Sequence, residues 1–330
     1  MRPLSILLLA LAMSATSAAF AAGVPRSWER AWPETDFTKH SIDYAEILEG
    51  GPPRDGIPSI DRPQFESIAQ AARWLDDRSP VIGLEVAGEA RAYPLGILIR
   101  HEIVNDRIGD IPVAVTYCPL CNAAIVFRRQ AKGRELDFGT TGKLRNSDLV
   151  MYDRQTGSWW QQFTGTAIVG AFLGSKLERL PARLESFADF RARAPKGRVL
   201  ARPTNRSGLP YGVNPYRGYD SAPRPFLYDG SLPRDVPPLS RVVSVGDRAW
   251  ALSLVREKGR IETGDGLVIT WKPGQASALD AFEIARARDV GTVVVQKRTD
   301  EGLVDIAYGV DFAFAFHAFY PAARIVTALD

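Results

Sequence analysis

Short runs of apolar and β-branched residues dominate the chain from residue 80 onward. The clearest runs cover residues 81–86, 90–93, 111–117, 124–128, 149–153 and 159–163. Glycine, asparagine and aspartate separate these runs, a pattern typical of strands joined by tight turns. Because such turns are too short for helical crossovers, we expect the strands to pair in antiparallel sheets.

Helical periodicity is confined to a few segments. Asp61 is suited to cap a helix that continues to about residue 76. Two shorter helices fit residues 95–104 and 184–194, whereas residues 24–58 show no regular pattern and predict an irregular surface arm. Together these elements predict an α+β fold, mainly antiparallel β with a few short helices.

Two sequence blocks recur in the same order. Residues 88–95 (GEARAYPL) match residues 246–252 (GDRAWAL) with one gap, and residues 115–119 (VTYCP) match residues 269–273 (ITWKP). Such recurrence indicates an internal repeat. We therefore expect two repeat-related, β-rich halves, residues 80–200 and 241–330, of which only the first carries cysteines.

The segment between these halves has an unusual composition. Residues 201–240 contain eight of the 23 prolines, together with Tyr211, Tyr216, Tyr219 and Tyr228. No regular element survives this proline density. The segment is either a linker or a loop. The tyrosines favour a loop packed over the cysteine-bearing face, because a solvated linker has little use for them.

The first residues have the pattern of a secretory signal peptide. Arg2 precedes an apolar run at residues 4–13, and Ala19-Phe20-Ala21 is an A-x-A cleavage site. Polar residues from Ser14 onward end the run well short of the roughly 20 apolar residues that span a bilayer. We expect residues 1–21 to be removed, leaving residues 22–79 as an N-terminal arm and helix. The mature protein is then periplasmic or otherwise secreted, without stable membrane insertion.

Composition and charge narrow the class of protein. The chain of 330 residues is 45% hydrophobic and 24% charged, which is ordinary for globular proteins and excludes intrinsic disorder. Its 41 basic and 38 acidic residues give a formal charge of +3, spread along the whole length. Without a concentrated basic patch, a nucleic acid is not expected as a partner.

Cys118 and Cys121 are the only cysteines and form a Cys-Pro-Leu-Cys motif. Closing so short a loop with a disulfide would stabilise the fold by only about 2 kcal/mol, so chemistry explains the pair better than stapling. The spacing fits either a dithiol redox pair or half of a metal site. Strand-like residues flank the motif, whereas redox cysteines sit at helix N-termini. The flanking strands therefore favour a metal-binding turn over a redox pair. Asparagine tolerates a left-handed backbone, which suits Asn122 at the end of this turn.

Two thiolates do not complete a zinc site, so further ligands are needed. Among His40, His101 and His317, the histidine that lies just upstream of the cysteine strand is His101. Met151 is the only methionine of the expected mature chain. Thiolates with an imidazole and a thioether suit Cu(I) or an incompletely filled zinc site. The alternatives are a structural, hydrogen-bonded His101 and a core Met151.

Other candidate binding residues are less specific. Asp153, Arg154 and Trp159 are either pocket residues or an ion pair and a core aromatic. In the proline-rich segment, Tyr211, Tyr216 and Tyr219 are candidates for contact with a bound substrate or ligand.

Five motifs occur together in this chain. They are HEIVND (101–106), YCPLC (117–121), LVMYDR (149–154), SWWQ (158–161) and YGVNPYRGY (211–219). In this combination the sequence resembles the bacterial family catalogued as domain of unknown function 3179, from about residue 57 to the C-terminus. The resemblance implies no activity or cofactor, because that family has no settled biochemical role.

Two functions fit these observations. The first is an exported soluble protein that uses the cysteine pair for soft-metal binding (Cu or Zn) or for thiol–disulfide exchange with a redox partner protein. The second is an extracytoplasmic module that binds a small ligand beneath the tyrosine-rich loop, with the cysteines as a local disulfide clip. No constellation indicates a hydrolase or an isomerase, so the sequence does not decide whether the protein is an enzyme.

Overall fold

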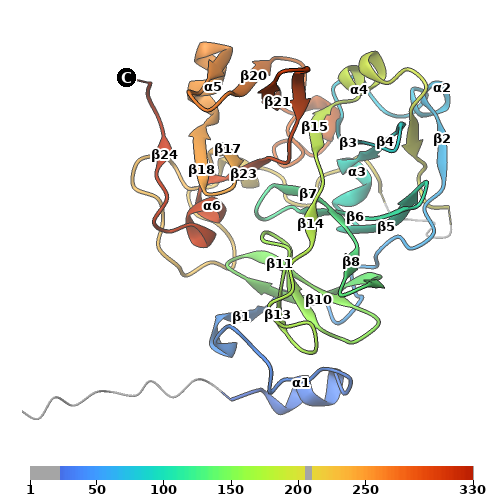
Figure 1. Ribbon diagram of the computed structural model, residues 1–330, viewed down its shortest axis with the longest axis vertical. Helices are drawn as coiled ribbons and strands as arrows, with labels where there is room; N and C mark the ends of the chain where they lie inside the picture. Colours follow the sequence, from blue (N-terminus) through green and yellow to red (C-terminus); the bar gives the residue numbers. More distant parts are fainter. Residues whose placement is uncertain (1–22, 205–209, 330) are drawn as a thin grey trace, which may run out of the picture.

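The computed structural model describes residues 23–204 and 210–329, and most of its strands lie in five sheets (Figure 1). The expected signal peptide at residues 1–21 lies outside the described residues. Within the described part of the chain, no helix is long and apolar enough to cross a membrane.

Each sheet has four or five strands. The first has the order β1 (Ile47–Glu49), β10 (Phe138–Arg145), β11 (Asp148–Asp153), β12 (Trp159–Gln161) and β13 (Thr166–Val169). The second has the order β14 (Glu178–Arg179), β7 (Ala123–Arg128), β6 (Ile111–Cys118) and β5 (Ile103–Ile108). The third has the order β15 (Ala182–Ser186), β3 (Pro80–Val86), β4 (Glu89–Pro94), β16 (Arg198–Leu200) and β2 (Phe65–Ser67).

The remaining two sheets come from the C-terminal part of the chain. One has the order β23 (Gly309–Phe312), β17 (Arg241–Val245), β18 (Arg248–Ala251) and β24 (Ile325–Val326). The other has the order β19 (Arg260–Glu262), β20 (Leu267–Lys272), β21 (Thr292–Thr299) and β22 (Gly302–Asp305). A two-stranded hairpin consists of β8 (Gln130–Ala131) and β9 (Arg134–Glu135).

The helices are all short. The α-helices are α1 (Arg26–Ala31), α2 (Ile68–Ala71), α3 (Leu95–Leu98), α4 (Phe187–Arg193), α5 (Leu252–Lys258) and α6 (Ala313–Phe319). The 3₁₀ turns are η1 (Tyr44–Glu46), η2 (Tyr219–Ser221) and η3 (Ile284–Arg286). None of the described α-helices exceeds two turns, so the sheets supply the framework of the fold.

The five sheets are arranged as the blades of a β-propeller, and the predicted α+β fold is wrong. Strands account for 39% of the residues and helices for 15%. The strand prediction for the individual runs nevertheless holds, because these runs form β3, β4, β6, β7, β11 and β12. The class was wrong because the helices predicted beside them are largely replaced by further strands.

Cross-strand pairing replaces much of two predicted helices. Residues 65–67 form β2 against β16, so only α2 remains of the helix expected from Asp61 to about residue 76. Residues 103–108 form β5 beside β6, which shortens the helix expected at 95–104 to α3. Helices of this length are marginal in isolation, and pairing with a neighbouring strand therefore overrides the local preference.

The expectation of two repeat-related halves is also wrong as a description of the architecture. The blades interlock, since β23 packs against β7 and β21 packs against β15. Two blades do share a local pattern, in which the third and fourth strands pair in parallel. Their strand orders are β15-β3-β4-β16 and β23-β17-β18-β24. A propeller repeats its blades, so this likeness is between blades rather than between halves.

Aromatic residues anchor the N-terminal arm to the β10–β13 blade. Trp28 and Trp32 from the α1 region and Phe37 surround Trp159 of β12, with ring centroids 5.3–5.4 Å from its own. All four side chains are buried. Figure 1 shows α1 against this end of the molecule. Trp159 therefore lies in the aromatic core between arm and blade.

The proline- and tyrosine-rich segment lies against the protein. Tyr219 in η2 is buried, and its hydroxyl donates to the carbonyl oxygen of Leu120 at 3.0 Å. The ring of Tyr228 packs on Phe314 with centroids 5.0 Å apart. The described part of this segment thus covers the cysteine turn.

Replacement of Trp159 by Ala is expected to lower the free energy of unfolding by roughly 3–5 kcal/mol, since it removes a fully buried indole. Loss of this contact should also expose the arm before residue 50 to proteases. Urea denaturation and limited proteolysis measure the two effects, with Phe282→Ala at an exposed position as the control. An arm that stays protected in W159A would contradict the anchoring role.

Candidate functional site

A tight turn between two central strands carries both cysteines. Strand β6 ends at Cys118, which pairs with Ala123 at the start of β7. The amide of Asn122 donates to the carbonyl oxygen of Pro119 at 3.2 Å, which closes the turn. Asn122 has a φ of 51°, in the left-handed region that asparagine tolerates better than most residues. The strand–turn–strand arrangement predicted from the sequence is confirmed.

Distant segments hold this turn in place. The side-chain amide of Asn122 donates to the carbonyl oxygen of Val310 at 2.7 Å. The amide of Phe312 donates to the carbonyl oxygen of Cys121 at 2.9 Å. Together with the bond from Tyr219 to Leu120, these contacts satisfy polar groups that the turn itself leaves unpaired.

Both cysteines are free thiols in the interior. Cys118 is 2% exposed and Cys121 is fully buried. Each sulfur lies against the carbonyl oxygen of Ser147, at 3.7 Å for Cys118 and 3.5 Å for Cys121. The structure thus gives no support to a disulfide clip.

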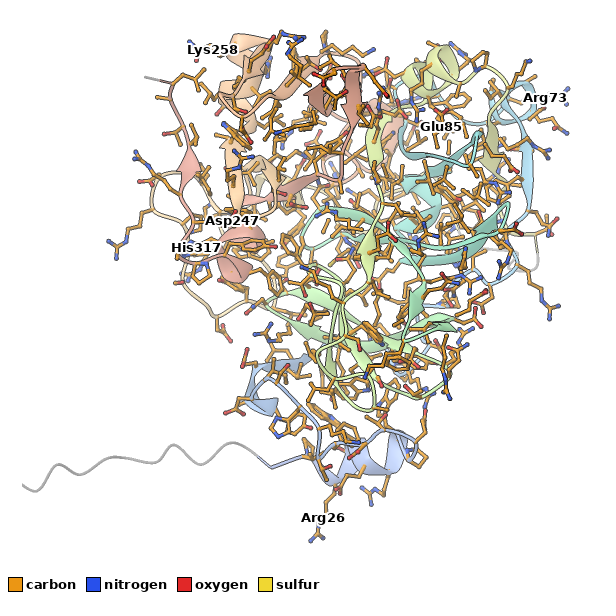
Figure 2. All side chains as sticks on the ribbon, in the orientation of Figure 1. Arg26, Arg73, Glu85, Asp247, Lys258 and His317 are labelled. Atoms are coloured by element: carbon orange, nitrogen blue, oxygen red, sulfur yellow. The ribbon has the colours of Figure 1, made fainter. Side chains whose placement is uncertain are left out.

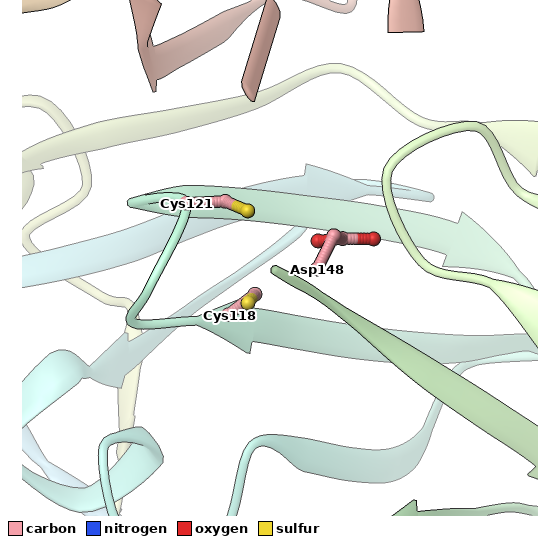
Figure 3. A group of neighbouring side chains, drawn as sticks. All are labelled: Cys118, Cys121 and Asp148. Carbon is pink, nitrogen blue, oxygen red and sulfur yellow. The ribbon is translucent and has the colours of Figure 1, made fainter. Parts of the chain in front are cut away.

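Asp148 completes the cluster. Its carboxyl oxygen and the two sulfurs lie within 4.8 Å of one another, and the three side chains converge in Figure 3. Oδ2 accepts hydrogen bonds from the side chain of Gln161 at 2.7 Å and from the amide of Phe163 at 2.8 Å. Oδ1 is buried and has no hydrogen-bond partner among the described residues. One carboxyl oxygen is therefore held in place while the other is available.

Burial dominates the electrostatics of the cluster. It raises the pKa of Asp148 to about 7, although the hydrogen bonds from Gln161 and Phe163 oppose the shift. Burial also raises the pKa of the Cys118 thiol and, to a greater extent, that of the Cys121 thiol. Near neutral pH both thiols therefore stay protonated and Asp148 is only partly ionised, unless a cation replaces their protons.

Asp148 was not predicted as a ligand because it lies on a different blade, 27 positions beyond Cys121. A usable signal was present, since Asp148 is an acidic residue at the start of the apolar strand β11. It also follows Asn146 and Ser147, both of which have left-handed backbones and form the turn before that strand.

A second buried acid, Glu102, lies near the cluster. Burial raises its pKa to about 8, and the charge on Asp148 adds to the shift. Glu102 belongs to the HEIVND motif, but the sequence analysis assigned it no role.

The structure does not place His101 among the potential ligands of this cluster. Its Nδ1 lies 2.8 Å from the carbonyl oxygen of Pro58, and its Nε2 lies 2.8 Å from the hydroxyl of Tyr211. Because a carbonyl only accepts, Nδ1 donates the proton of this bond, and the hydrogen bond with Tyr211 engages Nε2. This is the arrangement of the structural histidine that the sequence left as an alternative.

The other candidates occupy separate positions. Met151 is fully buried in the hydrophobic core on β11. Asp153 accepts a hydrogen bond from the indole of Trp160 at 2.8 Å, and Arg154 pairs with Asp61 at 2.5 Å. Among the candidate tyrosines, Tyr219 hydrogen-bonds to Leu120 in the cysteine turn, and Tyr216 borders the same cavity as Cys118.

His317 is remote from the cluster. It belongs to α6 and lies at the periphery of the molecule, where Figure 2 labels it. Its Nε2 is 3.2 Å from the hydroxyl of Ser231.

Comparison with known proteins identifies one family. The sequence model described as "Protein of unknown function (DUF3179)" matches residues 54–323. No curated protein and no solved structure matches the chain.

In metal-free protein, the protonated Asp148 makes stability depend on pH. Its pKa is higher in the folded state, about 7, than its ordinary value of 3.8. The stabilisation from the neutral carboxyl is therefore present below about pH 4 and is lost as the pH rises towards 7. As the pH rises across this window, the free energy of unfolding of D148N should increase relative to that of the parent by about 1.4 kcal/mol per pH unit.

Urea denaturation in the presence of a chelator measures this difference. E301Q, at an exposed turn position, serves as the matched control and should follow the pH profile of the parent. If the free energies of unfolding of D148N and the parent change in parallel across the window, Asp148 is ionised in the folded protein, and the raised pKa assigned to it is wrong.

Proposed function

The chain belongs to the DUF3179 family of proteins of unknown function, and we propose that it binds a zinc ion through Cys118, Cys121 and Asp148. The observation that carries the proposal is the convergence of three buried acidic groups within 4.8 Å. Each group alone would be neutral in the interior. Together they supply the anionic ligands that a buried cation requires.

The ligand types favour zinc over other metals. Zinc accepts thiolate and carboxylate ligands in tetrahedral sites. Copper(I) prefers sulfur and nitrogen, so the carboxylate of Asp148 makes it a weaker match. Calcium and magnesium need six or more oxygen ligands, which a site with two sulfurs does not offer. A copper-loaded protein would nevertheless retain the soft-metal role that the cysteine motif indicates.

Burial weakens the alternative of thiol–disulfide exchange. That reaction requires an accessible thiolate, because the thiolate is the attacking species. Cys118 is 2% exposed, and burial raises the pKa of both thiols. Redox cysteines show the opposite features, with partial exposure and a lowered pKa.

Three protein ligands leave one position of a tetrahedral ion open. Structural zinc sites are usually closed by four protein ligands, whereas sites that act on substrates keep a position for water. We further propose, from the leader-like sequence at residues 1–21, that the protein loads its metal after export.

Anaerobically purified protein is expected to take up one zinc ion per chain. The variant with both cysteines replaced by Ser should lose this binding. D148N should weaken it by at least about 10–100-fold, the scale at which even indirect partners of a metal act. Competition with a chromophoric chelator, followed by elemental analysis, measures the affinity and stoichiometry.

H101A tests the ligand set. It should retain zinc because both ring nitrogens of His101 hydrogen-bond to other groups. Loss of binding in H101A together with full binding in D148N would exclude the proposed ligands.

Zinc affinity should rise steeply with pH because binding displaces protons. Below a pKa of about 7, Asp148 and both thiols are protonated, so binding releases about three protons. Above that pH, only the thiols still hold protons, and the number falls to about two. Repeating the chelator competition at several pH values gives these slopes, and a flat profile would show that the thiols are not the ligands.

A further inference from the structure

A cavity of about 170 Å³ lies next to the cysteine turn and shares Cys118 with the cluster. Its walls are mainly apolar, and include Leu120, Leu144, Leu149, Phe226 and Leu227. An engineered apolar cavity of about 150 Å³ is large enough to bind benzene. The space therefore suits a small organic molecule rather than a peptide or a nucleotide.

Glu102 also lines this cavity. The residue is only 8% exposed, and its carboxyl has no hydrogen-bond partner among the described residues. A buried carboxyl without a partner is costly, so its presence in the wall points to a ligand.

The backbone fixes the position of Glu102. Its amide donates to the carbonyl oxygen of Leu98 at 2.7 Å, and its own carbonyl accepts from the amide of Tyr117 at 2.8 Å. The φ of 58° is left-handed, a conformation that is strained for a non-glycine residue. The surrounding strands thus hold the side chain at the cavity despite this strain.

The charges around the cavity favour a cation. Asp148 and Cys118 lie close enough to interact electrostatically with Glu102. Tyr216 also lines the cavity, but burial raises its pKa and its phenol stays neutral. Lys143 also lines the cavity, but its ammonium group pairs with Glu49 at 2.6 Å. Another basic residue, Arg100, interacts electrostatically with Tyr216 and lowers the pKa of its phenol.

The mouth of the cavity is formed by the tyrosine-rich segment. Phe226 is 50% exposed and Leu227 is 46% exposed, although both also line the cavity. The hydroxyl of Ser147 donates to the carbonyl oxygen of Phe226 at 2.6 Å, which ties this rim to the residue next to Asp148. A small molecule entering beside these side chains reaches Glu102 and Cys118.

We propose that this cavity binds a small primary amine, with its ammonium group on Glu102 and its hydrocarbon body against the leucine and aromatic walls. The aromatic rings of Tyr216 and Phe226 can add cation–π attraction. The inference goes beyond the proposed metal function and does not require a bound ion. With zinc in place, two thiolates and a carboxylate would leave a net charge of −1, which further favours a cation.

The test uses benzylamine and its neutral analogue benzyl alcohol. Calorimetric titration of the metal-free full chain, above the pKa of about 8 of Glu102, should show tighter binding of the amine. Glu102→Gln should weaken the binding of benzylamine by about 10–100-fold, the expected range for loss of a hydrogen bond to a charged group. It should leave the binding of benzyl alcohol unchanged. Glu301→Gln, at an exposed position, should bind the amine as the parent does.

Two further variants keep the outcomes distinct. Leu144→Phe narrows the cavity from another wall and should reduce binding of both compounds. Cys121→Ser changes a residue of the cluster that does not line this cavity, so it should weaken zinc binding but retain benzylamine, and failure of the metal proposal leaves this one standing. Equal affinity of the parent for amine and alcohol, or undiminished amine binding by E102Q, would overturn the inference.

Discussion

The burial of a single four-residue turn is the constraint on which the rest of the site depends. A turn normally lies at the surface, where water satisfies its polar groups. Here the residues between β6 and β7 lie inside, and their amides and carbonyls bond to Val310, Phe312 and Tyr219 instead. The blade of β23 and the tyrosine-rich segment are thus brought together by the hydrogen-bonding needs of one turn.

The same burial determines the chemistry of the acidic groups. In water, Asp148 and Glu102 would be ionised at neutral pH and would repel each other only weakly. In the interior, desolvation raises the pKa of Glu102 to about 8. It raises the pKa of Asp148 to about 7, although Asp148 accepts hydrogen bonds from Gln161 and Phe163. The protonated groups are therefore compatible with folding, and their ionisation becomes favourable only when a cation binds.

The sequence predicts local structure here better than the relation between distant segments. The β-branched runs form strands, and Asn122 takes the left-handed backbone expected at the end of the cysteine turn. The helix expected from Asp61 fails because β2 finds a partner in β16, more than 120 positions away. Asp148 was missed for a related reason: its approach to the cysteines depends on how two blades pack, which neither spacing nor periodicity encodes. His101 lies near the cysteines in sequence, but hydrogen bonds to Pro58 and Tyr211 fix its ring elsewhere.

The contacts of the turn with β23 have a consequence for the order of events during synthesis. Val310 and Phe312 lie almost 200 positions beyond the cysteines that they support. Until these residues have emerged and folded, Asn122 and the carbonyl of Cys121 lack their partners, and the thiols lack their cover. The hydrogen bonds of the cysteine turn are therefore completed only after residues 310–312 have been synthesised. A nascent chain that has not yet reached residue 310 exposes two reactive thiols without the cavity that later encloses them.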